Sequence, residues 1–311
     1  MYKFWKKWFE PKAYNQGYLP EKDGHKVFYS EYGNPKGKPI LVFHGGPGGG
    51  AKPRHASFAN LKKYRVILFN QRGCNNSLPL GKLENNNTQA LLEDAMRLLK
   101  YLNIKDKIIL RGSSWGSALA LMFAEKHPKM VEKLLLSQIF LVDMGAAWWE
   151  FEGCRWHYPE FVDELEHKAR GDVPAYFAAE INSKSKKKQL DAANYYGFYE
   201  RVCCSLNPKW NDCQELNEKA LAELRIFMHY RENDFFVGEA GEIMKNIKKI
   251  NHIPTVIVHN RLDFVCPFKG AYELHKAMPN SRLVVVSEFG HVGPKLYKTI
   301  NKEMRAELDE S

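Results

Sequence analysis

The sequence predicts an α/β protein with a mostly parallel central sheet, helices on both faces and an inserted helical cap. Seven short apolar runs are typical of strands, and most are continuous, as in strands covered on both faces. Helical patterns lie between these runs, and such alternation favours a parallel sheet. The alternation stops between residues 142 and 246, which predicts a core of residues 1–141 and 247–311 and a helical cap of residues 142–246.

The predicted elements follow in chain order. The strands start at Lys26, Pro39, Arg65, Lys107, Lys133, Pro254 and Arg282. A helix is predicted over residues 87–103, where leucines form one stripe and Thr88 is the candidate cap. A second helix, "SALALMFAEKHP", is stopped by Pro128, and a third, "FKGAYELHKAMP", lies between the last two strands. An insertion like the cap normally lies over the strand ends, where ligands bind.

Length and composition are those of an ordinary globular protein. The 311 residues suggest one or two domains, and 44% are hydrophobic and 26% charged. The net charge of +10 is compatible with a nucleic-acid partner. The lysines, however, are spread along the chain, and the densest run, residues 183–189, has no interleaved aromatic residue. We expect that run to be a solvated helix end or loop, and we expect no nucleic-acid partner.

Cysteine usage and the N-terminal segment favour a soluble, cytoplasmic protein with reduced thiols. The cysteines form no CxxC pair, no metal spacing and no clear disulfide framework: Cys74, Cys154, Cys203, Cys204, Cys213 and Cys266. The segment "MYKFWKKWFE" lacks the apolar core of a signal peptide, and no run is long enough to span a membrane. This segment is basic and amphipathic, so contact with a membrane surface is an alternative, but we expect its aromatic residues to pack on the body.

The stretch "RGSSWGS", residues 111–117, lies between a predicted strand and a predicted helix. It contains Gly112-x-Ser114-x-Gly116, which in this context predicts a nucleophile elbow. Small residues on either side of the serine let the strand and the helix pass closely at a strained turn. The helix N-terminus directs N–H groups at a developing oxyanion, so Ser114 is the candidate nucleophile and Trp115 a candidate backbone donor. The alternative is a passive bend of small residues.

The glycine-rich run "HGGPGGG", which starts at His44, directly follows a predicted strand. Glycines there bring backbone N–H groups close to a ligand, and Gly46, or its neighbour Gly45, is the second candidate oxyanion donor. The run lacks the Gly-Lys-Ser/Thr ending of a phosphate loop. A glycine-rich turn without a ligand is the alternative.

A serine hydroxyl needs a base, and the base needs an orienting acid. Asp263 and His291 each follow a predicted strand, in the chain order serine, acid, histidine. Because parallel strands end at the same sheet edge, both residues are expected beside Ser114. Other histidines fit worse, since His259 lies inside a strand and His275 on a helix.

These stretches together resemble the proline iminopeptidase (prolyl aminopeptidase) family of serine peptidases, which have the α/β-hydrolase fold. The similarity runs in family order through "DGHKVFYSEYGNPKGKPILVFHGGPGGG", "FNQRGCNNS", "GSSWGSALALMFAEKHP", "IPTVIVHNRLDFVCP" and "GH", from Asp23 to His291. It implies that the core is the catalytic domain, with Ser114 as nucleophile, Asp263 as acid and His291 as base. It also implies release of N-terminal proline from short peptides, with no metal and no organic cofactor.

The resemblance implies substrate-binding residues in the cap, and here the sequence departs from the family. Glu200 matches a family glutamate that binds the substrate amine, and Phe140 lies in the matching "IFL" stretch. Phe227 stands where the family has a second glutamate, whereas Glu150 stands where it has an aromatic residue. We expect Glu150 or Glu223 to take over the amine contact; alternatively, the pocket no longer favours a free amine.

Two other functions stay open. One is an esterase or amidase that acts on neutral acyl substrates, and the other is a non-catalytic binding protein on a hydrolase scaffold. The intact set of serine, acid and histidine favours a hydrolase. The sequence does not predict the oligomeric state.

Overall fold

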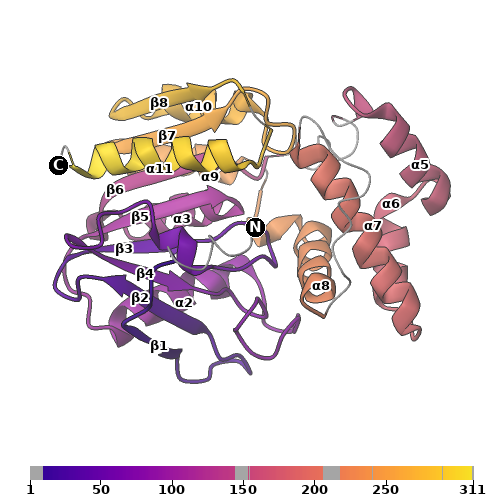
Figure 1. Ribbon diagram of the computed structural model, residues 1–311, viewed down its shortest axis with the longest axis horizontal. Coiled ribbons are helices and arrows are strands. Elements are labelled where there is room, and N and C mark those ends of the chain that lie inside the picture. The colour runs from indigo at the N-terminus through magenta and orange to yellow at the C-terminus, as the bar shows by residue number, and fades with distance from the viewer. Residues whose placement is uncertain are drawn as a thin grey trace, which may run out of the picture.

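A single sheet of eight strands organises the computed structural model, which describes residues 10–143, 153, 155–205, 218–239, 241–288 and 290–309 (Figure 1). The strands are β1 (Asn15–Tyr18), β2 (Phe28–Gly33), β3 (Lys38–Phe43), β4 (Tyr64–Phe69), β5 (Ile108–Ser114), β6 (Val131–Ile139), β7 (Thr255–Asn260) and β8 (Ser281–Val286). Their order is β1-β2-β4-β3-β5-β6-β7-β8. The pairs β1–β2 and β2–β4 are antiparallel and all others are parallel. The seven predicted strands are confirmed, and β1 is an additional edge strand.

Helices alternate with the parallel strands, as the sequence predicts. They are α2 (Thr88–Tyr101), α3 (Trp115–Lys126), α5 (Pro159–Ala169), α6 (Val173–Ile181), α7 (Lys186–Cys204), α8 (Glu218–Glu232), α9 (Glu242–Asn246), α10 (Phe268–Ala277) and α11 (Pro294–Asp309). Short 3-10 turns are η1 (Pro53–Ala56), η2 (Pro128–Met130), η4 (Asp234–Phe236) and η5 (Ile247–Lys249). Helix α11, which follows the last strand, was not predicted.

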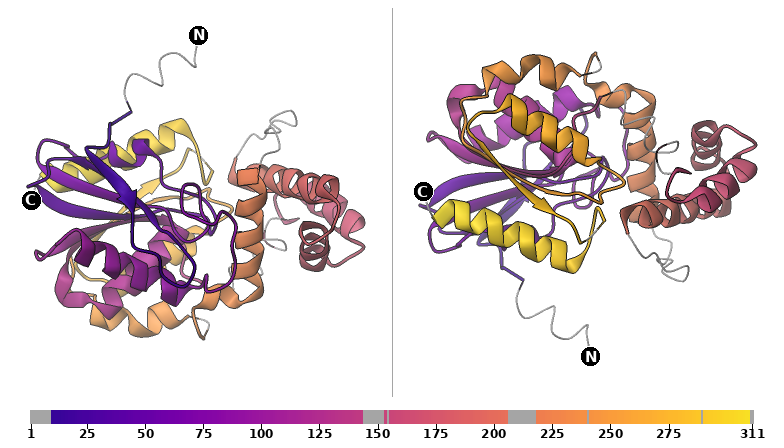
Figure 2. Two further views of the ribbon diagram at one scale, coloured as in Figure 1. Left: turned by 90° about the horizontal axis from the view of Figure 1, so that it is seen from below. Right: turned by 90° about the horizontal axis from the view of Figure 1, so that it is seen from above.

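Apolar side chains cover both faces of the sheet, which explains the continuous hydrophobic strands. On one face α2, α3, α9 and α10 pack in a cluster that includes Leu98, Phe123 and Leu274. On the other face η1 and α11 pack in a second cluster, which includes Ile300. The two layers of helices are visible on either side of the strands in Figure 2.

The chain between β6 and β7 forms a helical insertion, α5 to α8, on one side of the sheet (Figure 1). Its helices have an apolar cluster of their own, which includes Phe177 and Leu224. Both views of Figure 2 place α8 between α5–α7 and the sheet. Accordingly, Leu224 of α8 packs in the insertion, whereas Tyr230 packs in the core. The domain boundaries at residues 141 and 247 stay a prediction.

Several local predictions can be compared with the structure. The side chain of Asn87, and not that of Thr88, caps α2, because Asn87 Oδ1 accepts from the N–H of Ala90 at 2.9 Å. The lysine-rich run forms the capped start of α7, with Ser185 as the N-cap, so it is a helix end. Residues 1–9, Cys154 and Cys213 lie outside the described residues. The four described cysteines are buried: Cys74, Cys203, Cys204 and Cys266.

Candidate active site

The turn between β5 and α3 holds Ser114 in a strained backbone conformation. Its φ is +55° and its ψ is −130°, a region that L-residues rarely adopt and that costs of order 1–3 kcal/mol. The flanking glycines are obligatory. A Cβ at Gly116 would lie 2.1 Å from the carbonyl oxygen of Phe43, and one at Gly112 would lie 2.3 Å from the carbonyl oxygen of Gly116. The strand, the turn and the helix therefore have the geometry of a nucleophile elbow.

The glycine-rich loop after β3 lies directly against this turn. A Cβ at Gly45 would lie 3.4 Å from the Ser114 Cβ and 4.0 Å from its Oγ, and Gly46 has a φ of +102°. His44 and Gln71 fix the loop: Gln71 N donates to His44 Nε2 at 3.0 Å, and Gln71 Nε2 donates to the His44 carbonyl at 2.9 Å. Burial lowers the pKa of His44 to about 4, so its Nε2 is free to accept. Trp115 Nε1 donates to Gln71 Oε1 at 3.1 Å, which ties the loop to the first residue of α3.

Asp263 and His291 lie beyond the carboxyl ends of β7 and β8 and are hydrogen-bonded to each other. His291 Nδ1 lies 2.8 Å and 3.0 Å from the two carboxylate oxygens of Asp263. The backbone N–H groups of Val265 and Cys266 also donate to Asp263, at 3.0 Å and 2.8 Å. Both side chains are buried. The carboxylate therefore orients the imidazole, as the predicted acid of a catalytic pair would.

Burial and mutual attraction shift the pKa values of Asp263 and His291 in opposite directions. Burial would raise the pKa of Asp263, but the charge and the hydrogen bond of His291 outweigh it and hold that pKa below its ordinary value. Burial would lower the pKa of His291, but Asp263 outweighs it and raises that pKa well above its ordinary value. The arrangement therefore stabilises the imidazolium form of His291.

Cys266 lies beside both Ser114 and His291. Burial raises the pKa of its thiol, while interactions with His291 and with the Ser114 hydroxyl lower it in part, so burial dominates and the thiol stays neutral. Within the described residues, no hydrogen bond joins Ser114 to His291 directly; such catalytic contacts are often long in a ligand-free site. Sequence analysis did not select Cys266, because a single cysteine without a motif gives no signal.

Two other histidines, His259 and His275, have structural partners. His259, in β7, accepts from the N–H of Ile139 at 2.9 Å through Nδ1, and its Nε2 contacts the carbonyl of Cys266 at 2.8 Å. His275, on α10, contacts Ser281 Oγ at 2.7 Å.

An aromatic cluster connects the helical insertion to the nucleophile turn. The ring of Phe235 lies 5.6 Å from that of Trp115, 5.2 Å from Phe140 and 6.5 Å from Phe227, measured between centroids. Phe227 also lies 5.2 Å from Tyr196 of α7. The structure thus brings Phe140 and Phe227 into one cluster through Phe235. Phe235 was missed because its position depends on the turn η4, which no sequence pattern marks.

Of the three carboxylates that the sequence predicts to bind the substrate amine, the two that the structure describes lie on different helices. Glu150 lies outside the described residues, and Glu200 is exposed on α7. Glu200, His291 and Asp263 all influence the pKa of Cys204, and the Cys204 carbonyl accepts from the N–H of Val292 at 3.2 Å, so the end of α7 contacts the loop that carries His291.

Glu223, on α8, lies against the glycine-rich loop. A Cβ at Gly49 would be 3.7 Å from Glu223 Oε1, and one at Gly48 would be 2.5 Å from the Glu223 carbonyl oxygen. The side chain of Glu223 is accessible to solvent, yet surrounding protein raises the pKa of its carboxyl, an effect that Lys52 opposes. Solvent access together with a desolvated carboxyl is typical of a residue that lines a concave surface.

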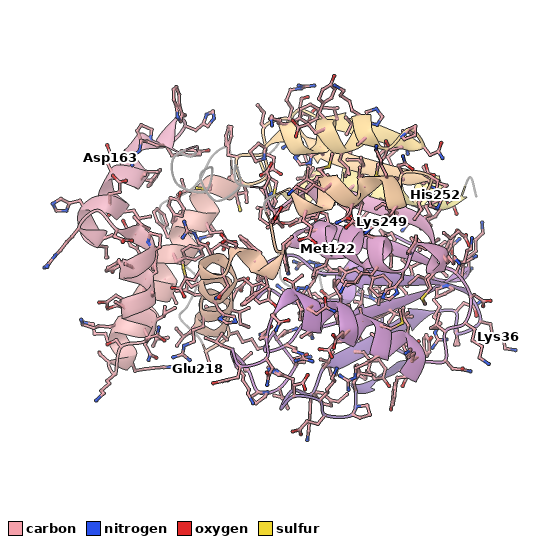
Figure 3. The ribbon with its side chains drawn as sticks, turned by 180° about the vertical axis from the view of Figure 1, so that it is seen from behind. Lys36, Met122, Asp163, Glu218, Lys249 and His252 are labelled. Atoms are coloured by element: carbon pink, nitrogen blue, oxygen red, sulfur yellow. The ribbon has the colours of Figure 1, made fainter. Side chains whose placement is uncertain are left out.

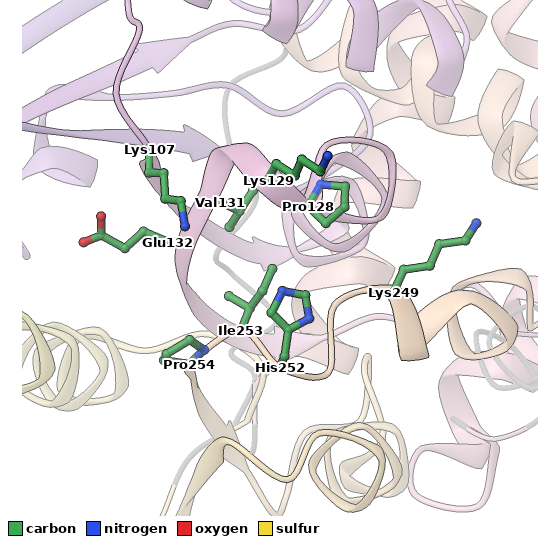
Figure 4. Close-up of a pocket in the computed structure, with 9 residues that line it drawn as sticks. All are labelled: Lys107, Pro128, Lys129, Val131, Glu132, Lys249, His252, Ile253 and Pro254. Carbon is green, nitrogen blue, oxygen red and sulfur yellow. The ribbon is translucent and has the colours of Figure 1, made fainter.

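A pocket of about 620 Å³ lies away from these residues. It is bordered by Lys107, Val131 and Pro254, which stand at the amino ends of β5, β6 and β7 (Figure 4). Figure 3 labels Lys249 and His252, which also line the pocket, on the sheet side of the molecule, far from Asp163 of the insertion. Ligands of open α/β sheets bind at the carboxyl ends of the strands, so this pocket is not the candidate active site.

No group of three His, Cys, Asp or Glu side chains in the described part of the chain is placed to hold a metal ion. None of the described helices combines the length and the apolar character needed to cross a bilayer.

The fold and the elbow define an α/β hydrolase. Residues 38–294 match the family model described as "alpha/beta hydrolase fold". The chain is 36% identical over 289 residues to a proline iminopeptidase of Arabidopsis thaliana, with 90% of this chain and 76% of the relative covered. It is 35% identical over 286 residues to a proline iminopeptidase of Neisseria gonorrhoeae, with coverages of 90% and 91%. The chain therefore belongs to the proline iminopeptidase family of serine hydrolases.

Solved structures show the same fold at lower sequence identity. VinJ superimposes with a TM-score of 0.65 at 20% identity, over 96% of this chain and 99% of its own. An aryl esterase of Burkholderia cenocepacia gives a TM-score of 0.65 at 15% identity, with coverages of 95% and 98%.

Proposed function

We propose that the protein is a serine aminopeptidase that releases N-terminal proline, or another small apolar residue, from short peptides. Ser114 is the nucleophile, Asp263 the acid and His291 the base, and the N–H groups of Gly46 and Trp115 form the oxyanion hole. The observation that carries the proposal is the bidentate contact of His291 Nδ1 with Asp263, at 2.8 Å and 3.0 Å, at the sheet edge that holds the strained Ser114.

The first half of the reaction forms an acyl-enzyme. Nε2 of His291 takes the proton of Ser114 Oγ while the oxygen attacks the scissile carbonyl carbon. The oxyanion that develops accepts from the backbone N–H groups of Trp115 and Gly46. The carbon–nitrogen bond then breaks, and the imidazolium of His291 gives its proton to the leaving amine. Asp263, whose pKa is held low, stays ionised and stabilises the imidazolium throughout.

The second half repeats these steps with water. His291 takes a proton from a water molecule, which attacks the acyl carbon, and the proton is returned to Ser114 Oγ as the ester bond breaks. The chemistry requires only side chains and backbone groups of this chain.

Apolar side chains are proposed to bind the proline ring of the substrate, and acidic side chains its amine. Phe140, Phe227 and Phe235 supply an aromatic surface between the insertion and Trp115, which suits the proline ring. A free proline nitrogen is cationic near neutral pH, so a carboxylate is its natural partner. Glu223 is supported by its position against the glycine-rich loop, and Glu200 by its position near the catalytic pair. Glu150, outside the described residues, stays a candidate.

Paired substrates test the amine contact. Proline arylamide should be cleaved much faster than its N-blocked analogue. Glu223→Gln should reduce the ratio of these two cleavage rates about tenfold or more, because it removes one charged partner of the amine. Glu232→Gln, on the last turn of the same helix, is the matched control. Equal rates on free and blocked substrates in the parent enzyme would refute an amine anchor. The triad has a separate test, since absence of phosphonate label at Ser114 would refute every hydrolase mechanism.

One observation favours a second candidate, an esterase or amidase acting on neutral acyl groups. Phe227 points its ring into the aromatic cluster, with Tyr196 at 5.2 Å, so this surface is apolar. A panel of aminoacyl arylamides and simple acyl esters separates the two activities. Faster turnover of the neutral esters under matched conditions would favour the second candidate.

We also propose a cytoplasmic location and small-molecule substrates rather than nucleic acid. The free, buried thiols of Cys74, Cys204 and Cys266 support a reducing compartment. Cell fractionation tests the location. Titration with DNA and RNA at two salt concentrations tests the second point, because binding driven by net charge would weaken steeply as salt rises.

A further inference from the structure

Gln138, near the end of β6, has a backbone conformation that needs an explanation. Its φ is +50°, in the left-handed region that disfavours a residue with a Cβ, and its side chain is 2% exposed. Such a conformation is unfavourable and persists where surrounding contacts enforce it. The pairing of β5 with β6 also shifts register between Ser113 and Ser114, next to Gln138. The strain thus lies beside the nucleophile turn.

The side-chain amide of Gln138 connects this turn to the loop that holds His291. Its Oε1 accepts from Ser113 Oγ at 2.5 Å and from Ser137 Oγ at 3.1 Å. Its Nε2 donates to the backbone carbonyl of His291 at 2.5 Å. One buried amide therefore contacts the residue before the nucleophile and the backbone of the proposed base.

Arg111 and the His291 carbonyl constrain the direction of these hydrogen bonds. The guanidinium can only donate, and its Nη2 donates to Ser137 Oγ at 3.1 Å. The hydroxyl of Ser137 then has one proton for two acceptors, Gln138 Oε1 at 3.1 Å and Ser113 Oγ at 3.3 Å. The carbonyl of His291 can only accept, so the Nε2 end of the amide must face it, and the Oε1 end then faces the two hydroxyls. The network therefore specifies a single orientation of the amide.

The neighbouring carbonyl of the same loop is held in a similar way. Asn260 Nδ2 donates to the carbonyl oxygen of Gly290 at 2.8 Å, and the N–H of Val292 donates to Cys204 of α7 at 3.2 Å. Side-chain amides from β6 and β7 thus hold two consecutive carbonyls, at residues 290 and 291. The Asp263 contact fixes the imidazole, whereas these contacts fix the backbone that carries it.

We propose that Gln138 is a positioning residue that holds the His291 backbone in register with Ser114, with the hydroxyls of Ser113 and Ser137 at its amide oxygen. The inference rests on the proposed hydrolase function, because it assigns Gln138 a part in presenting the base to the nucleophile. The strained backbone of Gln138 places its amide between the turn at Ser114 and the loop that carries His291, which are not joined by strand pairing in the part of the chain that the structure describes.

Two substitutions separate positioning from bulk stability. Gln138→Met keeps the length of the side chain and removes both ends of the amide, and Gln138→Glu keeps the acceptor but at neutral pH loses the donor to His291. The control is Thr255→Val, which removes a buried hydrogen bond to Ile253 at 2.9 Å at the opposite end of β7. If Gln138→Met folds poorly, Gln138→Gly takes its place, because glycine lacks the amide and adopts a positive φ without strain.

The first readout is the rate at which a fluorophosphonate labels Ser114 across pH, with kcat and KM for a simple activated ester. Both Gln138 variants should lose about ten- to a hundredfold in labelling rate and in kcat, with KM little changed, because a shift of about 1 Å in a catalytic group has that effect. Thr255→Val should lower Tm and leave both rates unchanged. Parent-like labelling rates and pH profiles in Gln138→Met would overturn the proposal.

The second readout does not depend on turnover. The proton shared by His291 Nδ1 and Asp263 should give a downfield NMR signal, assigned by its loss in His291→Ala. We expect that signal to shift or broaden in Gln138→Met and to persist in Thr255→Val. An unlabelled parent protein would refute the hydrolase function alone, whereas an unchanged signal in Gln138→Met would refute the positioning role alone.

Discussion

Glu125, near the end of α3, should make the stability of this protein fall as pH rises. Its Oε1 is buried without a hydrogen-bond partner among the described residues. Burial raises the pKa of its carboxyl to about 8, an effect that Lys249 opposes and Glu242 adds to. The unfolded chain has the ordinary pKa, so the folded state binds the proton more tightly. This stability is present below the ordinary pKa and is lost as pH rises towards 8.

The magnitude follows from the size of the shift. At 1.36 kcal/mol per pKa unit, the rise from the ordinary value sets an upper limit of about 5 kcal/mol. The side chain is half-buried and keeps access to water, so we expect about 1–2 kcal/mol. Glu125→Gln should match the parent protein at about pH 5 and exceed it by that amount at about pH 9.

Urea unfolding midpoints at these pH values measure the difference directly. Glu239→Gln is a suitable control, because Glu239 is exposed and its pKa is lowered by Lys245, so its replacement should bring no gain as pH rises. The same stability difference between Glu125→Gln and the parent protein at both pH values would refute the reasoning.

Three further substitutions test the site and the elbow. Asp263→Asn should reduce kcat by about 10⁴ with the fold preserved, measured by ester hydrolysis and circular dichroism, because the tautomer of His291 is no longer fixed; a loss under tenfold would contradict this. Gly116→Ala should greatly lower the yield of folded protein, since its Cβ would lie 2.1 Å from a backbone oxygen, whereas Gly293→Ala, with open space, should fold normally. Phe235→Ala should raise KM for proline arylamide and cost about 3–5 kcal/mol of stability. An unchanged KM would show that the aromatic cluster does not contribute to substrate binding.

The sheet could be predicted where its strands are continuous apolar runs covered on both faces. β1 could not, because "NQGY" is short and largely exposed at the sheet edge. α11 carried a signal that was overlooked: Leu296, Ile300, Met304 and Leu308 recur every four residues and are all buried. An apolar residue at every fourth position therefore predicts a helix here, even though the segment follows the last recognisable sequence motif.

The candidate triad could be predicted because strand ends and chain order restrict where an acid and a base can lie. Gln138, Cys266 and Phe235 could not. Gln138 contributes through a positive φ and a contact 153 residues away in sequence, at His291. Cys266 and Phe235 matter only because loops bring them beside Ser114 and Trp115. Such roles arise from tertiary contacts, which local periodicity does not encode.

The helical insertion separates two strands that are neighbours in space. β6 ends at Ile139 and β7 begins at Thr255, so the ribosome completes Ser114 and the whole insertion before it makes Asp263 and His291. Closing so long a loop costs little extra entropy, because that cost grows only logarithmically with length. On the proposed mechanism, the nascent chain is therefore inert until its last strands dock, because Ser114 lacks Asp263 and His291 until then.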